Sequence, residues 1–356
     1  MNMSASEAKK ERIWLVTGAS GHLGNTVIRK LLSEGERVRA FILEKERPKA
    51  LEGLSCEVVS GDVTETASIE PLFAGIKDKE IYLLHLASLI TIYAKAGPRV
   101  YRVNPGGTRH MLEAAKKHEV KRFLYCGTVH TLPLPGDFNA EIREITHYDP
   151  NLVYGDYAKS KAMASQLVLD AAREGLDAVI VQPSGIIGPN DYLDGIFTRL
   201  FEKLVDRKLP AMIQGTYNFV DVDDVAGGLI AAAKKGRGGE SYNLTGHNIS
   251  VLEIMNKAAE ITGRRPFKST VPLWLAKLAA PFAEWWSKKT GKTPVLTGYS
   301  LFTMNTPHNF SHDKAARELG YTIRPMDETI DKTLRFMIEQ KRFKKAVDLS
   351  YASARS

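Results

Sequence analysis

Residues 13–24 read Ile-Trp-Leu-Val-Thr-Gly-Ala-Ser-Gly-His-Leu-Gly, an apolar run followed by three glycines at three-residue spacing. The apolar run predicts a buried parallel strand, and the glycines predict a turn into a helix that begins near His22. Gly18 permits the tight turn, Gly21 lets the backbone approach a pyrophosphate, and Gly24 lets the helix pack against the strand. The helix N-terminus offers unpaired N–H groups to phosphates. The segment therefore predicts a dinucleotide-binding turn.

The glycine spacing is G-x-x-G-x-x-G and differs from the usual G-x-G-x-x-G, so the glycines alone do not distinguish a ligand site from a plain strand-to-helix connection. The sequence around the turn makes that distinction. A helix over 26–32 and a second strand after Gly35 begin a βαβ unit. Strands are predicted over 13–17, 37–43, 56–60, 81–86, 121–127 and 177–182. Helical segments between them include 69–76, 99–118 and 156–172. The alternation predicts an α/β fold with a Rossmann-type doubly wound parallel sheet, whose ligand lies across the carboxyl ends of the strands.

The composition is that of an ordinary globular protein of 356 residues, with 44% hydrophobic and 25% charged residues. The formal charge of +8 raises the question of nucleic acid, but the lysines and arginines are scattered and form no nucleic-acid motif. A basic surface suits anionic ligands such as nicotinamide dinucleotides or coenzyme A thioesters. The two cysteines, Cys56 and Cys126, exclude a disulfide framework and indicate a cytoplasmic location.

Four regions are predicted along the chain. These are a disordered tail over 1–11, a Rossmann domain over 12–183, a smaller C-terminal substrate-binding lobe over 184–340 with some chain returning to the Rossmann core, and a basic tail over 341–356. The lobe is expected to contain helices over 222–234, 251–261, 313–319 and 326–338, and a strand over 241–244.

The most apolar stretch of the lobe is 271–286, flanked by Lys288, Lys289 and Lys292. It is interrupted by Lys277, Pro281 and Glu284 and is too short to be a transmembrane segment, which needs about 20 apolar residues. Three interpretations stay open: a packed helix of the lobe, a lid over an apolar pocket, or a helix in contact with a membrane surface.

A tyrosine and a lysine stand one helical turn apart. Tyr157 and Lys161 are at i and i+4, so their side chains lie on one face of the predicted helix and can serve one ligand. An ammonium about 4 Å from a phenol, at an effective dielectric constant of about 20, contributes about 4 kcal/mol, enough to lower the tyrosine pKa from about 10 by at most about three. The alternative is a packed aromatic and a solvated lysine. Thr128, at the end of the fifth strand, adds a hydroxyl that completes a proton-transfer set.

The motifs together resemble the extended short-chain dehydrogenase/reductases of the NAD-dependent epimerase/dehydratase superfamily. The resemblance runs from residue 12 to 338. Its motifs are Thr-Gly-x-x-Gly-x-x-Gly at 17–24, Gly-Asp-Val at 61–63, His-Leu-Ala-Ser at 85–88, Asn104 within 103–108, Thr128, the pair Tyr157 and Lys161, Gln-Pro-Ser-Gly-Ile-Ile-Gly-Pro at 182–189, and Phe-Val-Asp-Val-Asp-Asp-Val-Ala at 219–226.

The resemblance implies roles for the matching residues. Tyr157 would exchange a proton with the substrate oxygen, Lys161 would hold the nicotinamide ribose and lower the tyrosine pKa, and Thr128 would orient the reacting oxygen. Asn104 would support a proton relay. The implied cofactor-binding residues are Gly18, Ser20, Gly21, His22, Leu23, Gly24, Leu43, Lys45, Asp62, Val63, Leu86, Ala87, Ser88, Tyr157, Lys161, Pro183, Gly185 and Ile186.

No metal site is predicted, because His22 and His85 lack partners at ligand spacing and are interpreted as structural. Relatives commonly pair through the helices that carry Asn104 and Tyr157, so a homodimer is expected by analogy.

The choice between NAD and NADP depends on the end of the second strand. Ile42 stands where NAD enzymes often carry an acid, and Leu43 where many NADP enzymes carry an arginine. Glu44 could serve a ribose, whereas Lys45 or Arg47 could reach a phosphate. The sequence leaves the choice open.

Departures from the family pattern bear on the substrate. Val129-His130 follows Thr128 where sugar-nucleotide dehydratases carry acids, and Tyr217-Asn218 replaces the Arg-Asp of many sugar-nucleotide epimerases. The pattern is closest to the dihydroflavonol reductase, cinnamoyl-CoA reductase and 3β-hydroxysteroid dehydrogenase branch. The resemblance implies an oxidoreductase for a secondary alcohol or ketone on a hydrophobic, steroid-like, flavonoid-like or 3-oxoacyl substrate. The alternatives are a sugar-nucleotide epimerase and a non-catalytic cofactor-sensing protein.

Overall fold

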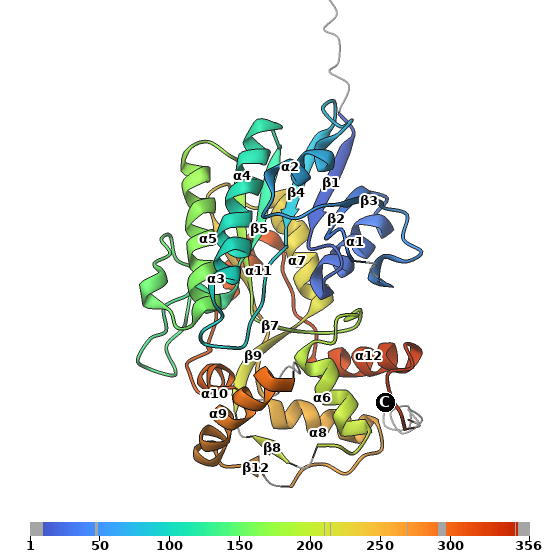
Figure 1. The fold of residues 1–356 in the computed structure, drawn as a ribbon, viewed down its shortest axis with the longest axis vertical. Coiled ribbons are helices and arrows are strands. Elements are labelled where there is room, and N and C mark those ends of the chain that lie inside the picture. Colours follow the sequence, from blue (N-terminus) through green and yellow to red (C-terminus); the bar gives the residue numbers. More distant parts are fainter. Residues whose placement is uncertain are drawn as a thin grey trace, which may run out of the picture.

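The computed structural model describes residues 10–46, 49–209, 211–213, 215–268, 270–290, 297–345 and 347. Its main part is a seven-stranded sheet with the strand order β10-β6-β5-β4-β1-β2-β3, and every neighbouring pair is parallel (Figure 1). The predicted doubly wound α/β fold is confirmed. The strands are β1 (Arg12–Thr17), β2 (Arg37–Ile42), β3 (Glu57–Ser60), β4 (Glu80–His85), β5 (Arg122–Cys126), β6 (Ala178–Pro183) and β10 (Ser241–Leu244).

The first strand is central and buried on both faces, which explains its continuous apolar run. Ile13 and Leu15 pack in one hydrophobic cluster with residues of α4 (Gly107–Lys117) and α5 (Asp156–Arg173). Trp14 and Val16 pack on the opposite face with α1 (His22–Ser33) and α7 (Val222–Lys235). The sheet therefore lies between two helical layers (Figure 1).

Two predicted helices are interrupted by proline. The segment predicted over 69–76 begins and ends three residues earlier and is split into α2 (Thr66–Ile69) and a 3₁₀ turn (Glu70–Phe73) that contains Pro71. The segment over 99–118 consists of α3 (Pro98–Tyr101), a π-helical turn (Arg102–Gly106) that contains Pro105, and α4. Because proline has no N–H to donate, the regular i to i−4 pattern cannot run through it.

Three elements from the region predicted for the smaller lobe pack with the main sheet. Strand β10 pairs with β6, helix α7 packs against α1, and α11 (Asp313–Leu319) packs on α7 and β10.

The smaller lobe holds a three-stranded sheet, β11-β9-β7, and a two-stranded sheet, β12-β8. Figure 1 shows α6, α8, α9, α10 and α12 grouped around these strands, with α9 and α10 side by side at one end of the molecule. Among the described helices, none combines the length and apolarity that crossing a membrane requires. The strands are β7 (Gly185–Ile187), β8 (Met212–Ile213), β9 (Thr216–Asp221), β11 (His247–Ser250) and β12 (Thr270–Val271). The helices are α6 (Ile196–Val205), α8 (Val251–Ile261), α9 (Leu273–Thr290), α10 (Gly298–Thr303) and α12 (Met326–Glu339), and α11 (Asp313–Leu319) packs on α7.

Candidate active site

A cleft of about 1210 Å³ separates the carboxyl ends of the main strands from the smaller lobe. Thr128, Tyr157 and Lys161 are among the residues that line it. Of the residues predicted to bind cofactor, Lys45 is exposed outside the cleft wall. The others all line it: Gly18, Ser20, Gly21, His22, Leu23, Gly24, Leu43, Asp62, Val63, Leu86, Ala87, Ser88, Tyr157, Lys161, Pro183, Gly185 and Ile186.

The glycine turn has no room for side chains. Gly18 has a φ of +67°, and a Cβ there would lie 2.7 Å from the backbone nitrogen of Ala87. A Cβ on Gly24 would lie 2.1 Å from the carbonyl oxygen of Gly18. Helix α1 begins at His22, and its N-cap residue Gly21 makes no side-chain capping hydrogen bond. The open first turn of α1 at the cleft therefore fits the pyrophosphate of a dinucleotide.

The end of the cleft near β2 and β3 carries two acids. The Asp62 carboxylate accepts hydrogen bonds from the backbone N–H and the hydroxyl of Thr64, at 2.8 and 2.9 Å, and so fixes the turn after β3. The Glu46 carboxylate lines the cleft and accepts a 2.7 Å hydrogen bond from the hydroxyl of Ser20. Glu46 is not among the predicted residues, because it lies beyond the positions next to β2 that the family pattern uses. Arg47 lies outside the described residues.

The predicted catalytic residues meet at the centre of the cleft. Thr128 lies just beyond β5, and Tyr157 and Lys161 lie on the first turns of α5. Lys161 is 2% exposed; its ammonium donates a 2.6 Å hydrogen bond to the carbonyl oxygen of Cys126 and lies 4.4 Å from the ring centre of Tyr125. Burial lowers the pKa of Lys161 to about 8. A neutral fraction of this lysine is therefore present near pH 8.

The pKa of Tyr157 differs from the sequence-based expectation. Burial raises it, and the nearby Cys126 and Tyr299 raise it further, whereas the hydrogen bond from Thr128 opposes the increase. The ammonium of Lys161 is directed to the carbonyl of Cys126, and burial outweighs the groups that lower the pKa of Tyr157. In the protein alone, Tyr157 is therefore protonated near neutral pH.

Asn104 lies behind the cleft and does not line it. Its side-chain amide accepts a 2.8 Å hydrogen bond from the N–H of Leu89 and donates to the hydroxyl of Ser160 at 2.9 Å. Ser160 in turn donates to the carbonyl oxygen of Tyr157 at 2.8 Å. In this structure, Asn104 thus connects the segment after β4 to the first turn of α5.

The two histidines named from the sequence hold backbone segments together. His85 is fully buried between the hydroxyls of Thr17 and Thr108, at 2.8 and 3.1 Å, and burial lowers its pKa to about 3. His22 makes a 2.8 Å hydrogen bond to the carbonyl oxygen of Pro189. Within the described ranges, no three His, Cys, Asp or Glu side chains are grouped so that they could hold a metal ion.

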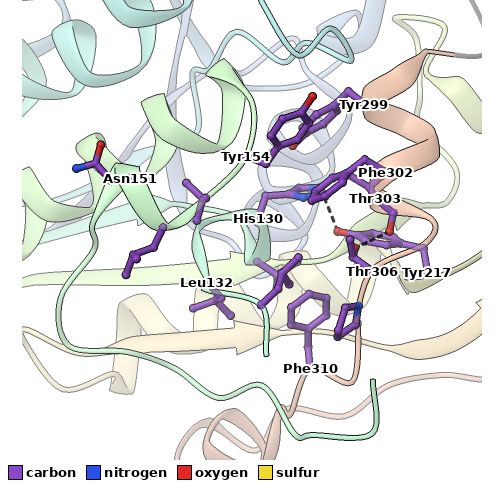
Figure 2. A pocket seen from close by; sticks show the side chains of 15 residues that line it. His130, Leu132, Asn151, Tyr154, Tyr217, Tyr299, Phe302, Thr303, Thr306 and Phe310 are labelled. Atoms are coloured by element: carbon purple, nitrogen blue, oxygen red, sulfur yellow. Dashed lines mark hydrogen bonds between the residues drawn. The ribbon is translucent and has the colours of Figure 1, made fainter. Parts of the chain in front are cut away.

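A second cavity of about 330 Å³ adjoins the cleft (Figure 2). His130, Tyr217, Tyr299 and Thr303 line both spaces, and the three rings among them form a shared wall. The His130 ring stacks on Tyr217 at 5.6 Å between ring centres and makes a 3.1 Å hydrogen bond to its hydroxyl. Burial lowers the pKa of His130 to about 4, so the ring is neutral at pH 7. The cavity is otherwise mostly apolar, with Leu132, Leu134, Leu152, Val153, Phe302, Pro307 and Phe310 in its lining.

Sequence reasoning used His130 only as a departure from the dehydratase pattern. The available signal was its position two residues after Thr128, beyond the end of a central strand.

The fold and the glycine turn define a dinucleotide-binding protein of the α/β class. Residues 14–245 match the NAD dependent epimerase/dehydratase family, and the chain belongs to that family. The resemblance given by the motifs is thereby confirmed, and the protein is an oxidoreductase with a nicotinamide dinucleotide as its cofactor.

Named relatives span most of the chain. A putative dihydroflavonol 4-reductase from Synechocystis is 31% identical, covering 86% of this chain and 89% of its own length. Sterol demethylase protein B from Methylococcus capsulatus is 29% identical, covering 86% and 92%. The crystal structure of a protein named gox2253 is 30% identical, with a TM-score of 0.78 over 93% of this chain and 99% of that chain.

Proposed function

We propose that this protein interconverts a secondary alcohol and a ketone on a hydrophobic substrate. The main support for this proposal is the lining of the cleft on the side of the smaller lobe, beyond Thr128 and Tyr157. Its large side chains are predominantly apolar and aromatic, which favours a substrate with an apolar skeleton. They are Ile90, Ile92, Leu193, Ile196, Phe197, Leu200, Leu209, Met212, Ile213, Tyr217, Phe219, Tyr299 and Met304.

The positions of the residues support the roles that the family resemblance implies. Tyr157 is protonated in the protein alone, which is the form that donates a proton to a carbonyl oxygen. Thr128, beside it, orients that oxygen by a hydrogen bond. Lys161, which lines the same cleft, would hold the ribose hydroxyls of a bound dinucleotide. The bound dinucleotide supplies the hydride donor or acceptor. In the reduction direction, hydride adds to the carbonyl carbon and the Tyr157 proton goes to the oxygen.

The names of two relatives support an apolar substrate, since one refers to a sterol and the other to a dihydroflavonol. We propose a steroid-like, flavonoid-like or 3-oxoacyl compound as the substrate.

We also propose a cytoplasmic location, from the cysteine content, and a homodimer through α4 and α5, where Met163 exposes apolar surface. Sedimentation velocity tests the dimer.

We propose NAD rather than NADP as the cofactor. Glu46 places a carboxylate on the cleft wall beside Ser20, near the end of β2. A carboxylate accepts hydrogen bonds from ribose hydroxyls and repels a 2′-phosphate. Of the two bases that could balance it, Lys45 is exposed outside the cleft and Arg47 lies outside the described residues.

The test follows reduced-cofactor absorbance with sterols, flavonoids, 3-oxoacyl esters and nucleotide sugars, using both dinucleotides. We expect turnover on an apolar alcohol or ketone and its loss by at least about a hundredfold in Tyr157→Phe, with cofactor binding retained. Tyr82→Phe is the matched control, because Tyr82 lies on β4 and does not line the cleft. Inversion of a nucleotide sugar without net cofactor turnover would contradict the proposal, as would full activity in Tyr157→Phe.

A further inference from the structure

Helix α9 has the reverse of the usual amphipathic arrangement. Its large apolar side chains recur every four residues on the outer face: Trp274, Leu278, Phe282 and Trp286 are 64, 70, 67 and 56% exposed. We call these four residues the outer stripe. The buried positions of the helix are the small residues Ala276, Ala280 and Ser287. A helix that packs on a protein core buries its large apolar face, whereas the outer stripe is left uncovered by the part of the chain that the structure describes.

The charge around α9 is strongly positive. Residues 264–292 contain seven lysines or arginines and one acid, Glu284, so this segment carries +6 of the chain's net +8. The carboxylate of Glu284 accepts a 2.7 Å hydrogen bond from the N–H of Gly298. Lys277 and Lys289 are exposed beside the stripe, and the Lys289 ammonium lies 4.4 Å from the ring centre of Trp285. Exposed tryptophans flanked by lysines are typical of helices that lie at a bilayer surface.

The inner face of α9 is fixed to the wall of the cleft. Ala276 and Ala280 pack against Leu301 of α10, with Met304 alongside. The hydroxyl of Tyr93 is 2.7 Å from that of Ser287. Tyr93 and Met304 both line the cleft. The outer stripe is therefore held on the outside of the same structure whose inside borders the substrate space.

We propose that α9 docks on the surface of a bilayer that contains anionic lipid, with the outer stripe in the acyl boundary and the lysines at the headgroups. Lysine is depleted in protein–protein interfaces, so the charge around the stripe favours lipid over a protein partner or a second copy of the chain. Docking places the wall of the cleft against the membrane. If the substrate is hydrophobic, a point that rests on the proposed function, it passes from the lipid to the cleft without crossing water.

The experiment measures binding of the full chain to sedimenting vesicles of phosphatidylcholine with and without phosphatidylglycerol. Three of the four tryptophans lie on α9, and the fourth, Trp14, is fully buried, so tryptophan emission reports on this helix. We expect binding to the phosphatidylglycerol vesicles, a blue shift of emission, and release at high salt, because screening weakens the lysine contribution. No substrate or cofactor is present, so the outcome is separate from the test of the enzymatic function.

Two variants distinguish docking through α9 from non-specific adsorption to the vesicles. Leu278→Ser with Phe282→Ser removes the centre of the outer stripe and should lower vesicle binding at least about tenfold, with unchanged circular dichroism, since both side chains are exposed. Phe138→Ser is the matched control, because Phe138 is 57% exposed in a loop outside the lobe helices and should bind as the wild type does. Binding that survives the double substitution would overturn the proposal. So would failure of the wild-type chain to bind, or an oligomer that the double substitution dissociates.

Discussion

Replacing Lys161 by methionine should stabilise the cofactor-free protein at pH 7 while abolishing its activity. Burial holds the pKa of Lys161 at about 8, against an ordinary value of 10.5. Below pH 8 the folded protein therefore keeps a buried charge that the unfolded chain carries in water. At pH 7 the difference corresponds to about 3 kcal/mol of lost stability. Methionine removes that loss of stability. It also leaves the Cys126 carbonyl without a hydrogen-bond donor, which lowers the free energy of unfolding by about 2 kcal/mol. A net gain of about 1 kcal/mol remains.

The pH dependence is the sharper readout. Between pH 8 and 10.5 the unfolded chain binds more protons at this lysine than the folded protein does, so wild-type stability rises with pH. From pH 7 to 9 the rise from this group is about 1 kcal/mol, and the advantage of Lys161→Met should disappear. Urea unfolding of cofactor-free protein at the two pH values measures the difference. Lys159→Met, on the same helix but partly exposed, is the control. Equal pH dependence of wild type and Lys161→Met would refute the reasoning.

Three further predictions concern the cleft. Gly24→Ala places a Cβ 2.1 Å from the Gly18 carbonyl, so calorimetry should show loss of dinucleotide binding and about 1–3 kcal/mol lower stability; unchanged binding would contradict the assigned turn. Glu46→Arg should shift the ratio of kcat/KM from NAD towards NADP by about tenfold or more, and an unchanged ratio would remove Glu46 from the cofactor site. The pKa of His130 is about 4 when folded and 6.5 ordinarily, so wild-type stability falls by about 2 kcal/mol from pH 7 to 5 through this group. In urea unfolding, the stability of His130→Gln should fall correspondingly less from pH 7 to 5. An equal fall in the two proteins would show that another group titrates.

The fold could be predicted because its signals are local. The apolar run of β1 and the glycines after it depend on neighbours in sequence, and the structure places both as expected. The interruption near Pro105 was missed because a helical pattern over 99–118 was stronger than one proline, and a π-helical turn accommodates that proline.

The site was predicted in its parts but not in its electrostatics. The partner of Lys161 is the carbonyl of Cys126, 35 residues away, and a backbone oxygen gives no sequence signal. The expectation that Lys161 lowers the pKa of Tyr157 assumed an ammonium about 4 Å from the phenol and left out the effect of burial. Likewise, the wall formed by His130, Tyr217 and Tyr299 joins three segments that meet only through the packing of β9 and α10 beyond β5.

That wall has a consequence for how the enzyme could change over generations. The Tyr217 side chain borders both chambers, so we expect a smaller residue there to widen the connection between them while the backbone that carries Thr128 and Tyr157 stays in place. Longer molecules would then be accommodated by extension into existing empty space, while the reacting centre is left unaltered. The length of the accepted substrate could thereby change independently of the reaction chemistry.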